Sequence, residues 1–105
     1  MMMPVIEAGK RSVRVDDSGF LLDSNDWTKE IAEALAKSSA LYPLTEEHWL
    51  VIIYIRQYFK EYNSAPMLRA ISKRTKLEVR RLRTLFPRSC HECMCKIAGL
   101  PKGTG

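Results

Sequence analysis

The chain has 105 residues, of which 46% are hydrophobic and 28% are charged, as in ordinary soluble globular proteins. This length predicts one domain over residues 1–105, with a core that needs no disulfides. No apolar run reaches the roughly 20 residues of a membrane helix, and the first ten residues lack the apolar segment of a secretory signal. We therefore expect a cytoplasmic protein without membrane insertion.

The net charge of +5 is unevenly distributed along the chain. Residues 1–65 contain 7 Lys or Arg and 10 Asp or Glu, a net charge of −3, whereas residues 66–105 contain 10 and 2, a net charge of +8. The basic second part indicates an acidic partner, such as a nucleic acid, an acidic protein surface or an anionic ligand. A solvated basic face fits the charge equally well.

Residues 1–22 are expected to form a small β-hairpin or meander. Val13 and Val15 alternate with polar residues, and Phe20 and Leu22 resume the alternation after the turn sequence Asp-Asp-Ser-Gly at 16–19. A hairpin of this size is marginal alone, so we expect it to pack on helices.

Residues 24–87 carry the patterns of a helical core. The segment SNDWTKEIAEALAKSS predicts a helix with Ser24 or Asn25 as its cap. The segment PLTEEHWLVIIYIRQYFKEYN predicts a longer helix that Thr45 caps and Asn63 ends.

The longer helix is apolar on nearly every side, which is typical of a central, buried helix. His48 and Arg56 are eight residues apart on it, too far for one ligand set. We expect both side chains to be structural.

Two short helices are expected before Pro87. Thr75 and Glu78 fit a capping box that starts the second of them. This second helix carries Arg80, Arg81 and Arg83, and the pair outlines a helix-turn-helix. Such a unit binds DNA in some proteins and is only a packing motif in others.

All three cysteines lie close together, as Cys90, Cys93 and Cys95, with His91 between the first two. A structural zinc site usually needs two separated ligand pairs, and the only other histidine is His48. We therefore predict no metal site and no cofactor.

Thiol chemistry is the alternative use of this cluster. Arg88, His91 and Lys96 provide positive charge, which favours the reactive thiolate, and only Glu92 opposes them. Small buried cysteines that merely fill space are equally compatible with the local sequence.

Five segments of this sequence resemble the DsrC/TusE family of sulfur-carrier proteins, which includes the gamma subunit of dissimilatory sulfite reductase. The segments are DDSGFLLDSNDW, LTEEHW, SAPMLRAISK, TLFP and CKIAGLPKGTG, and the resemblance extends from about Val13 to Gly105. The last segment is the most specific, because family members end in a sequence like C-K-x-A-G-L-P-K-P-T-G-C-V. Here Gly103 replaces a proline.

The resemblance implies an α+β, mostly helical fold. A small N-terminal β-hairpin packs on a helical array with a helix-turn-helix, and residues 88–105 form a flexible, cysteine-bearing arm. In the family, the penultimate cysteine of this arm receives and delivers sulfur as a persulfide. In the DsrC branch a second, upstream cysteine pairs with it, the arm enters dissimilatory sulfite reductase near the siroheme, and the two cysteines hold sulfur as a trisulfide. In the TusE branch the arm relays sulfur toward 2-thiouridine in tRNA.

By its position in the sequence, Cys95 matches the upstream cysteine of the DsrC branch. The resemblance implies that its thiol holds or resolves a persulfide. The chain stops at Gly105, where the family continues with Cys and Val. Either two residues are truncated, or this homologue has lost the terminal thiol. Cys90 and Cys93 are additional thiols, and one of them could replace the terminal cysteine as the partner of Cys95. Cys93 is only two residues from Cys95, which strains a disulfide, whereas Cys90 is five residues away and could reach Cys95 if the loop bends.

The partner surface is expected to be basic. Arg69 and Lys73 match the family's basic surface near the arm, and we add further cations to the predicted partner-binding set: Arg80, Arg81, Arg83, Lys96 and Lys102.

The sequence thus predicts a DsrC-like sulfur carrier, a co-substrate of dissimilatory sulfite reductase rather than a self-contained enzyme. One alternative is a TusE-like relay for tRNA thiolation. A second is a DsrC-like regulatory, DNA-binding module without carrier activity. The direction of sulfur flux and the sulfur donor stay open.

Overall fold

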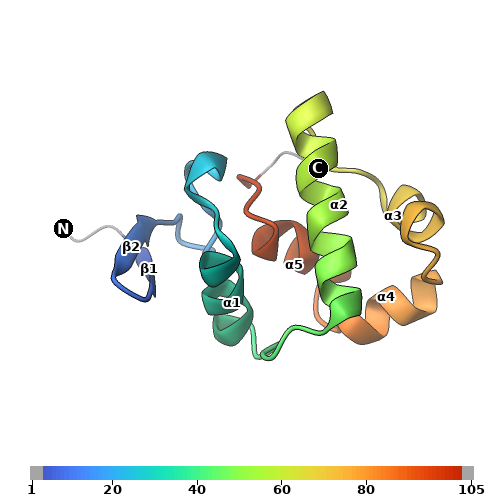
Figure 1. Cartoon of the computed structure of the whole chain (residues 1–105), viewed down its shortest axis with the longest axis horizontal. Helices are drawn as coiled ribbons and strands as arrows, with labels where there is room; N and C mark the ends of the chain where they lie inside the picture. Colours follow the sequence, from blue (N-terminus) through green and yellow to red (C-terminus); the bar gives the residue numbers. More distant parts are fainter. Residues whose placement is uncertain (1–3, 103–105) are drawn as a thin grey trace.

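The computed structural model describes residues 4–102, which form a short hairpin followed by helices (Figure 1). The elements in chain order are β1 (Val5–Ala8), β2 (Arg11–Arg14), a 3₁₀ turn (Ser24–Asp26), α1 (Lys29–Ser38), α2 (Glu46–Tyr62), α3 (Leu68–Thr75), α4 (Val79–Leu85) and α5 (Cys90–Ile97). The hairpin lies at one end of the molecule, α3 and α4 at the other, and α5 between α1 and α2 (Figure 1). The predicted α+β, mostly helical class is confirmed.

The hairpin differs from the predicted one in its pairing. Its strands β1 and β2 are antiparallel, with Ile6 opposite Val13. The predicted turn at residues 16–19 exists, but it closes only one bridge, between Val15 and Leu21. The Asp16 carboxylate accepts hydrogen bonds from two backbone N–H groups within this turn, which tightens it.

The cap of α1 is Thr28, and the prediction of Ser24 or Asn25 is wrong. Thr28 Oγ1 accepts a hydrogen bond from Ile31 N at 3.1 Å. Ser24 and Asn25 lie in the separate 3₁₀ turn, which the carboxylate of Asp23 closes by accepting from Asn25 N at 2.9 Å.

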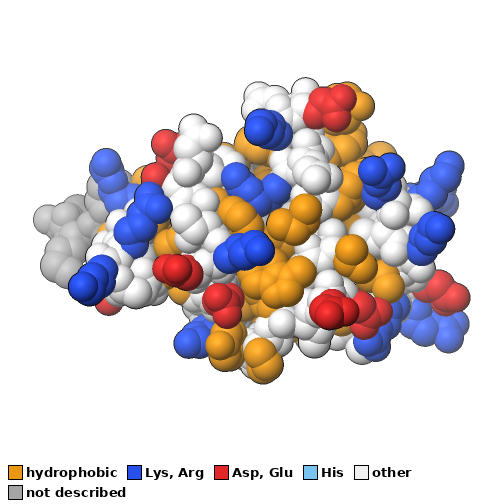
Figure 2. Space-filling model, in the orientation of Figure 1, with side chains coloured by type: hydrophobic (Ala, Val, Ile, Leu, Met, Phe, Trp, Pro, Cys, Tyr) orange, Lys and Arg blue, Asp and Glu red, His pale blue; other side chains and the backbone are white. Residues whose placement is uncertain are grey.

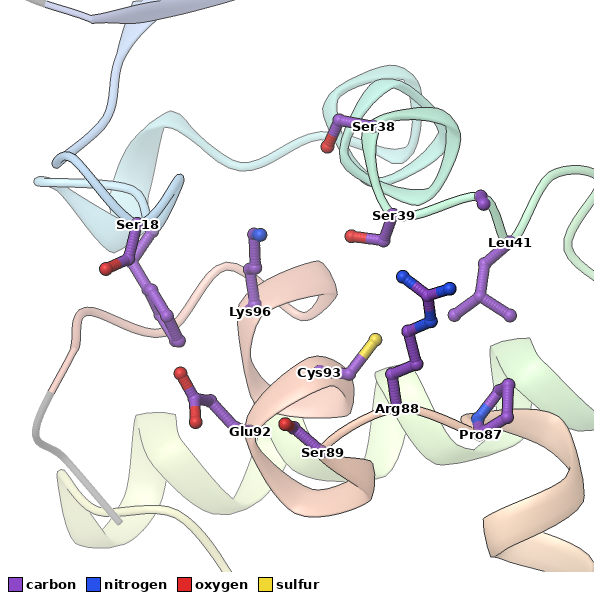
Figure 3. Close-up of a pocket in the computed structure, with 12 residues that line it drawn as sticks. Ser18, Ser38, Ser39, Leu41, Pro87, Arg88, Ser89, Glu92, Cys93 and Lys96 are labelled. Atoms are coloured by element: carbon purple, nitrogen blue, oxygen red, sulfur yellow. The ribbon is translucent and has the colours of Figure 1, made fainter.

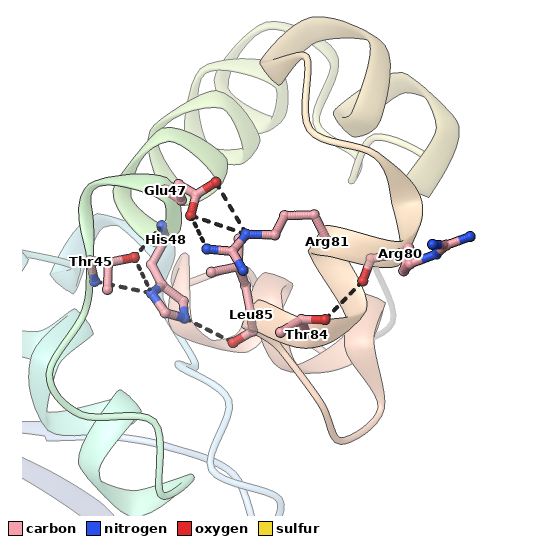
Figure 4. A network of polar contacts seen from close by, with 7 residues as sticks. All are labelled: Thr45, Glu47, His48, Arg80, Arg81, Thr84 and Leu85. Carbon is pink, nitrogen blue, oxygen red and sulfur yellow. Dashed lines mark hydrogen bonds and ion pairs between the residues drawn. The ribbon is translucent and has the colours of Figure 1, made fainter.

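The start of α2 is held by a pair of residues that cap each other, as Figure 4 shows. Thr45 N donates to His48 Nδ1 at 3.0 Å, and His48 Nε2 lies 2.8 Å from Leu85 O. Because a carbonyl oxygen only accepts, Nε2 carries the proton, and the ring joins α2 to the end of α4. The predicted cap at Thr45 and the structural role of His48 are confirmed, as is the end of α2 at Asn63, which has a φ of 55°.

The prediction that α2 is buried on nearly every side is wrong. Val51, Ile52 and Ile55 have no exposed surface, but Leu50 and Ile53 on the opposite side are 54% and 37% exposed. The elements that α2 contacts most are α3 and α5, and they leave Leu50 and Ile53 exposed. Figure 2 shows hydrophobic atoms across the middle of one face of the molecule, with Lys and Arg side chains among them and at both ends.

The connection between α3 and α4 is tight, but the predicted capping box is wrong. Thr75 belongs to the last turn of α3, where its Oγ1 donates to Ile71 O at 2.7 Å. Lys76 then adopts a left-handed conformation with a φ of 62°. Glu78 precedes α4 without a side-chain cap.

Helix α5 packs in the core, whereas the family resemblance predicted that residues 88–105 form a flexible arm. Met94 and Ile97 are fully buried, and so are Ala98 and Leu100 after the helix ends. Helix α5 contacts α1 and α2, and burial of its apolar residues there explains why the segment packs as a helix. Gly103 to Gly105 lie outside the described residues. No helix within residues 4–102 is long and apolar enough to cross a membrane.

Candidate functional site around α5

Helix α5 places its three cysteines in different environments. Cys90 and Cys93, in its first turns, are half-buried, whereas Cys95 is only 7% exposed. Burial raises the pKa of all three thiols, and it raises the pKa of Cys95 to about 12. In this structure Cys95 is therefore a neutral thiol at physiological pH.

His91, one turn earlier on α5, places a titratable group beside Cys95. Cys95 Sγ lies 4.0 Å from His91 Nε2, which is also 2.7 Å from Pro66 O. Since Pro66 O only accepts, Nε2 carries a proton and donates it to this carbonyl. Nε2 thus cannot take the proton of Cys95 here, and His91 instead ties α5 to the loop before α3.

The end of α5 is a Schellman motif built on Gly99. Gly99 N donates to Lys96 O at 3.0 Å, and Leu100 N donates to Cys95 O at 3.1 Å. Gly99 has a φ of +81°, which strongly favours glycine over residues with a side chain. The backbone of Cys95 is therefore part of the bonding that stops the helix.

Two side chains from distant segments hold this end, and we call them the Trp27–Arg56 clamp. Trp27 Nε1 donates to Ile97 O at 2.9 Å, and Arg56 Nη1 donates to Ala98 O at 2.9 Å. The guanidinium of Arg56 stacks 4.4 Å from the centroid of the Trp27 ring. Burial lowers the pKa of Arg56. The clamp fixes the backbone directly after Cys95 and so keeps this thiol covered.

A separate cavity of about 490 Å³ lies beside Cys93 (Figure 3). It is bounded by the Asp16–Phe20 turn, the end of α1 and the start of α5. Arg88 and Lys96 line it together with serine residues. Cys93 thus faces a space of mixed polar and apolar lining that includes two cations, whereas Cys95 faces the core.

The comparison with protein families shows which family this chain belongs to. The model of the family described as "DsrC like protein" matches residues 7–105. This chain belongs to the DsrC-like family. The clamp and the covered Cys95 are therefore features of a DsrC-like protein.

Individual relatives match the chain over nearly its whole length. The gamma subunit of dissimilatory-type sulfite reductase from Nitratidesulfovibrio vulgaris is 38% identical, covering 99% of this chain and 98% of that protein. Sulfurtransferase TusE from Photorhabdus laumondii is 39% identical, covering 97% and 96%. The crystal structure of the oxidized gamma subunit DsrC from Archaeoglobus fulgidus superposes with a TM-score of 0.85 at 43% identity, covering 97% and 98%.

The predicted partner-binding cations of this DsrC-like chain do not form one cluster. Arg69 and Lys73 are exposed on α3, and Arg80 and Arg83 are exposed on α4. Arg81 forms an ion pair with Glu47 of α2 (Figure 4), which raises the pKa of Arg81 and lowers that of Glu47.

The two remaining predicted cations lie near the turn that follows β2. Lys102 Nζ is 2.9 Å from Ser18 Oγ, and Lys96 lines the cavity beside Cys93. Their partner-binding roles stay predictions. The described residues 4–102 contain no group of three or more His, Cys, Asp or Glu placed to hold a metal ion.

Sequence reasoning found the cysteines of this DsrC-like site but missed the clamp. Arg56 was expected to be structural, and no role was predicted for Trp27. Their targets lie 70 residues away for Trp27 and 42 residues away for Arg56. No local pattern signals contacts at that separation.

Arg56→Met is expected to speed the alkylation of Cys95 by iodoacetamide about tenfold. The substitution removes the charged donor to Ala98 O, a bond worth about 1.5–3 kcal/mol, and each 1.4 kcal/mol or so changes the opening equilibrium about tenfold. Alkylation is measured in the Cys90→Ser/Cys93→Ser background by mass spectrometry. Lys60→Met, an exposed change on the same helix, is the control. Equal rates in the two variants would show that the clamp does not hold Cys95.

Proposed function

We propose that this DsrC-like protein is a sulfur carrier that holds sulfur as a persulfide on Cys95 and delivers it to a protein partner. The observation that carries the proposal is the full-length match to two relatives that the comparisons name as sulfur-handling proteins. The protein would act as a co-substrate, because the described residues offer a thiol but no second group placed to activate it.

The uptake step is an exchange between sulfur atoms. The Cys95 thiolate attacks the outer sulfur of a donor persulfide, a new S–S bond forms on Cys95, and the donor leaves as a thiolate that takes up the proton. No oxidant or reductant is consumed, because the transferred sulfur keeps its oxidation state.

Uptake at Cys95 requires the end of α5 to open. The thiol is 7% exposed, and its pKa of about 12 leaves almost no thiolate while it is covered. Release of the Trp27–Arg56 clamp would expose the thiol to water and return its pKa toward an ordinary value. Docking of a partner that competes for the Ile97 and Ala98 carbonyls would therefore control loading.

The test uses a protein in which Cys95 is the only thiol. The Cys90→Ser/Cys93→Ser variant is treated with polysulfide and its mass is measured, with the additional Cys95→Ala variant as the control. We expect the first protein to gain the mass of one or more sulfur atoms and the second to gain none. Absence of sulfur from the Cys95-only protein would overturn the proposal.

The acceptor distinguishes a DsrC-like from a TusE-like role, and the two named relatives match this chain almost equally well. Protein loaded with labelled sulfur is offered to purified dissimilatory sulfite reductase and, separately, to a tRNA-thiolation extract. We expect the reductase to remove the label. Transfer into 2-thiouridine without turnover by the reductase would favour the TusE-like alternative.

The regulatory alternative depends on the α3–α4 unit. Arg80 and Arg83 are exposed on α4, where they are available to phosphates, whereas Arg81 is engaged by Glu47. Binding of duplex DNA that weakens steeply with salt, together with no sulfur uptake, would favour this role over a carrier.

A further inference from the structure

The cavity beside Cys93 is built from segments that are distant in sequence. The turn at residues 16–20, the end of α1 and the start of α5 surround it. In Figure 3 the Cys93 sulfur points into the space between Arg88 and Lys96, with Ser39 across the cavity. The thiol thus faces two cations.

The charged groups of the two cations have no polar partner in the described part of the fold, although the end of the Lys96 side chain lies against the turn at Gly19. Neither the guanidinium of Arg88 nor the ammonium of Lys96 forms a hydrogen bond or ion pair with another residue within 4–102. The nearby end of α1 does not need them, because its last carbonyls accept bonds from its own backbone: Ala40 N bonds to Lys37 O and Leu41 N bonds to Ala36 O.

Hydroxyl groups add neutral donors to the same space. Ser39 and Ser89 line the cavity, and their hydroxyls make no hydrogen bond to another described residue. Glu92 is the one acidic lining residue, and in Figure 3 its carboxylate lies on the side of Ser18, away from Arg88. Two cations and two unused hydroxyls around a thiol match a small, multiply charged oxyanion.

We propose that this cavity binds a sulfur oxyanion that carries a sulfane sulfur, with thiosulfate as the simplest case, and that Cys93 accepts that sulfur. This inference rests on the proposed carrier function, and it adds a second sulfur-bearing thiol and a class of donor. It also assigns a role to Cys93, which the family pattern leaves without one.

The transfer balances without a further reactant. The Cys93 thiolate attacks the outer sulfur of thiosulfate, an S–S bond forms on Cys93, and the S–S bond within thiosulfate breaks. Sulfite leaves with the electron pair of that bond and takes up the proton that the thiol has released. Arg88 and Lys96 offset the negative charge of the bound anion, and Lys96 also opposes the burial and the charges of Cys90 and Glu92 that raise the pKa of Cys93.

The experiment uses the full chain and thiosulfate labelled in its outer sulfur. After incubation, persulfides are trapped by alkylation and located by peptide mass spectrometry. We expect the label on Cys93 in the wild-type protein and its loss in Cys93→Ser. No label, or label on Cys95 alone, would overturn the inference.

The cations are tested separately from the thiol. We expect Arg88→Gln and Lys96→Gln to slow the labelling of Cys93 about tenfold each, while Arg88→Lys keeps most of the rate. Lys37→Gln is the control, because Lys37 precedes Ser38 on α1 but does not line the cavity. Circular dichroism and thermal melting identify any variant that fails to fold, for which the conservative Arg88→Lys comparison still applies. Equal rates in all four variants would contradict an anion site.

Anion binding has a readout that does not depend on sulfur transfer. Sulfate has the same charge and tetrahedral oxygens but no sulfane sulfur, so it should slow the labelling of Cys93 by competition and leave no label itself. If sulfate has no effect, the cavity is not an oxyanion site. Failure here is distinct from failure of the carrier function, because the Cys95-only protein with polysulfide tests that function in the absence of Cys93.

Discussion

Gly99→Ala is expected to lower the free energy of unfolding by about 3 kcal/mol and to make Cys95 accessible. Gly99 has a φ of +81°, which costs a residue with a Cβ about 1–2 kcal/mol. A Cβ at this position would also lie 2.8 Å from Trp27 Cγ and 2.9 Å from Trp27 Cβ. Overpacking of this kind typically costs about 1–3 kcal/mol.

The Trp27 side chain cannot relieve this contact at low cost. Its Nε1 donates to Ile97 O, and the guanidinium of Arg56 covers its ring. If the ring shifts, the clamp opens; if it stays, the backbone after Cys95 must move. Either response exposes the thiol, so we expect alkylation of Cys95 to rise by about two orders of magnitude.

Gly9→Ala is the matched control for Gly99→Ala. Gly9 also has a positive φ, of +62°, but its nearest neighbour to an added Cβ is the flexible carboxylate of Glu30 at 3.7 Å. It should therefore show only the backbone cost, about 1–2 kcal/mol, and unchanged alkylation of Cys95. Urea denaturation and alkylation rates measure both effects. Equal losses of stability at the two glycines would contradict the proposed role of the Trp27 contact.

Local patterns predicted those parts of the fold that local contacts determine. Thr45 and Asn63 bound α2 because a cap and a left-handed stop act within one turn of the helix. The predicted hairpin joined the strand at Val13 to the segment that follows it, whereas the observed hairpin joins it to the segment that precedes it. The alternation at Val13 fits pairing with either segment. Only the tertiary structure shows that Ile6 is its partner.

The site was predicted less completely because burial and clamping are long-range properties. The family resemblance identified Cys95, and the spacing of the cysteines showed that they are close together. Nothing in CHECMCKIAGL distinguishes a mobile arm from a packed helix, since its apolar residues suit either a partner's channel or this protein's own core. The unlike environments of Cys93 and Cys95 follow from the opposite directions in which residues two apart point on a helix.

The pH dependence of stability should report the covered state of Cys95. The pKa of this thiol is raised from 9.0 in an unfolded chain to about 12 in the folded protein. Between these values the unfolded state has released the proton and the folded state retains it, so the free energy of unfolding falls as pH rises. The stabilisation is complete below pH 9 and is lost toward pH 12. Below pH 9 the folded thiol should also react with iodoacetamide about a thousandfold more slowly than an unfolded one.

Cys95→Ala removes this contribution and keeps the other titrating groups. We expect wild-type protein to lose about 2–3 kcal/mol more than Cys95→Ala between pH 9 and pH 11, measured by urea denaturation at each pH. Both proteins share the titration of lysine and tyrosine residues, so the difference isolates the thiol. Parallel curves would mean that Cys95 ionises as easily in the folded protein as in the unfolded chain. The thiol would then be open to water without any partner, and release of the clamp would not be the step that controls sulfur uptake.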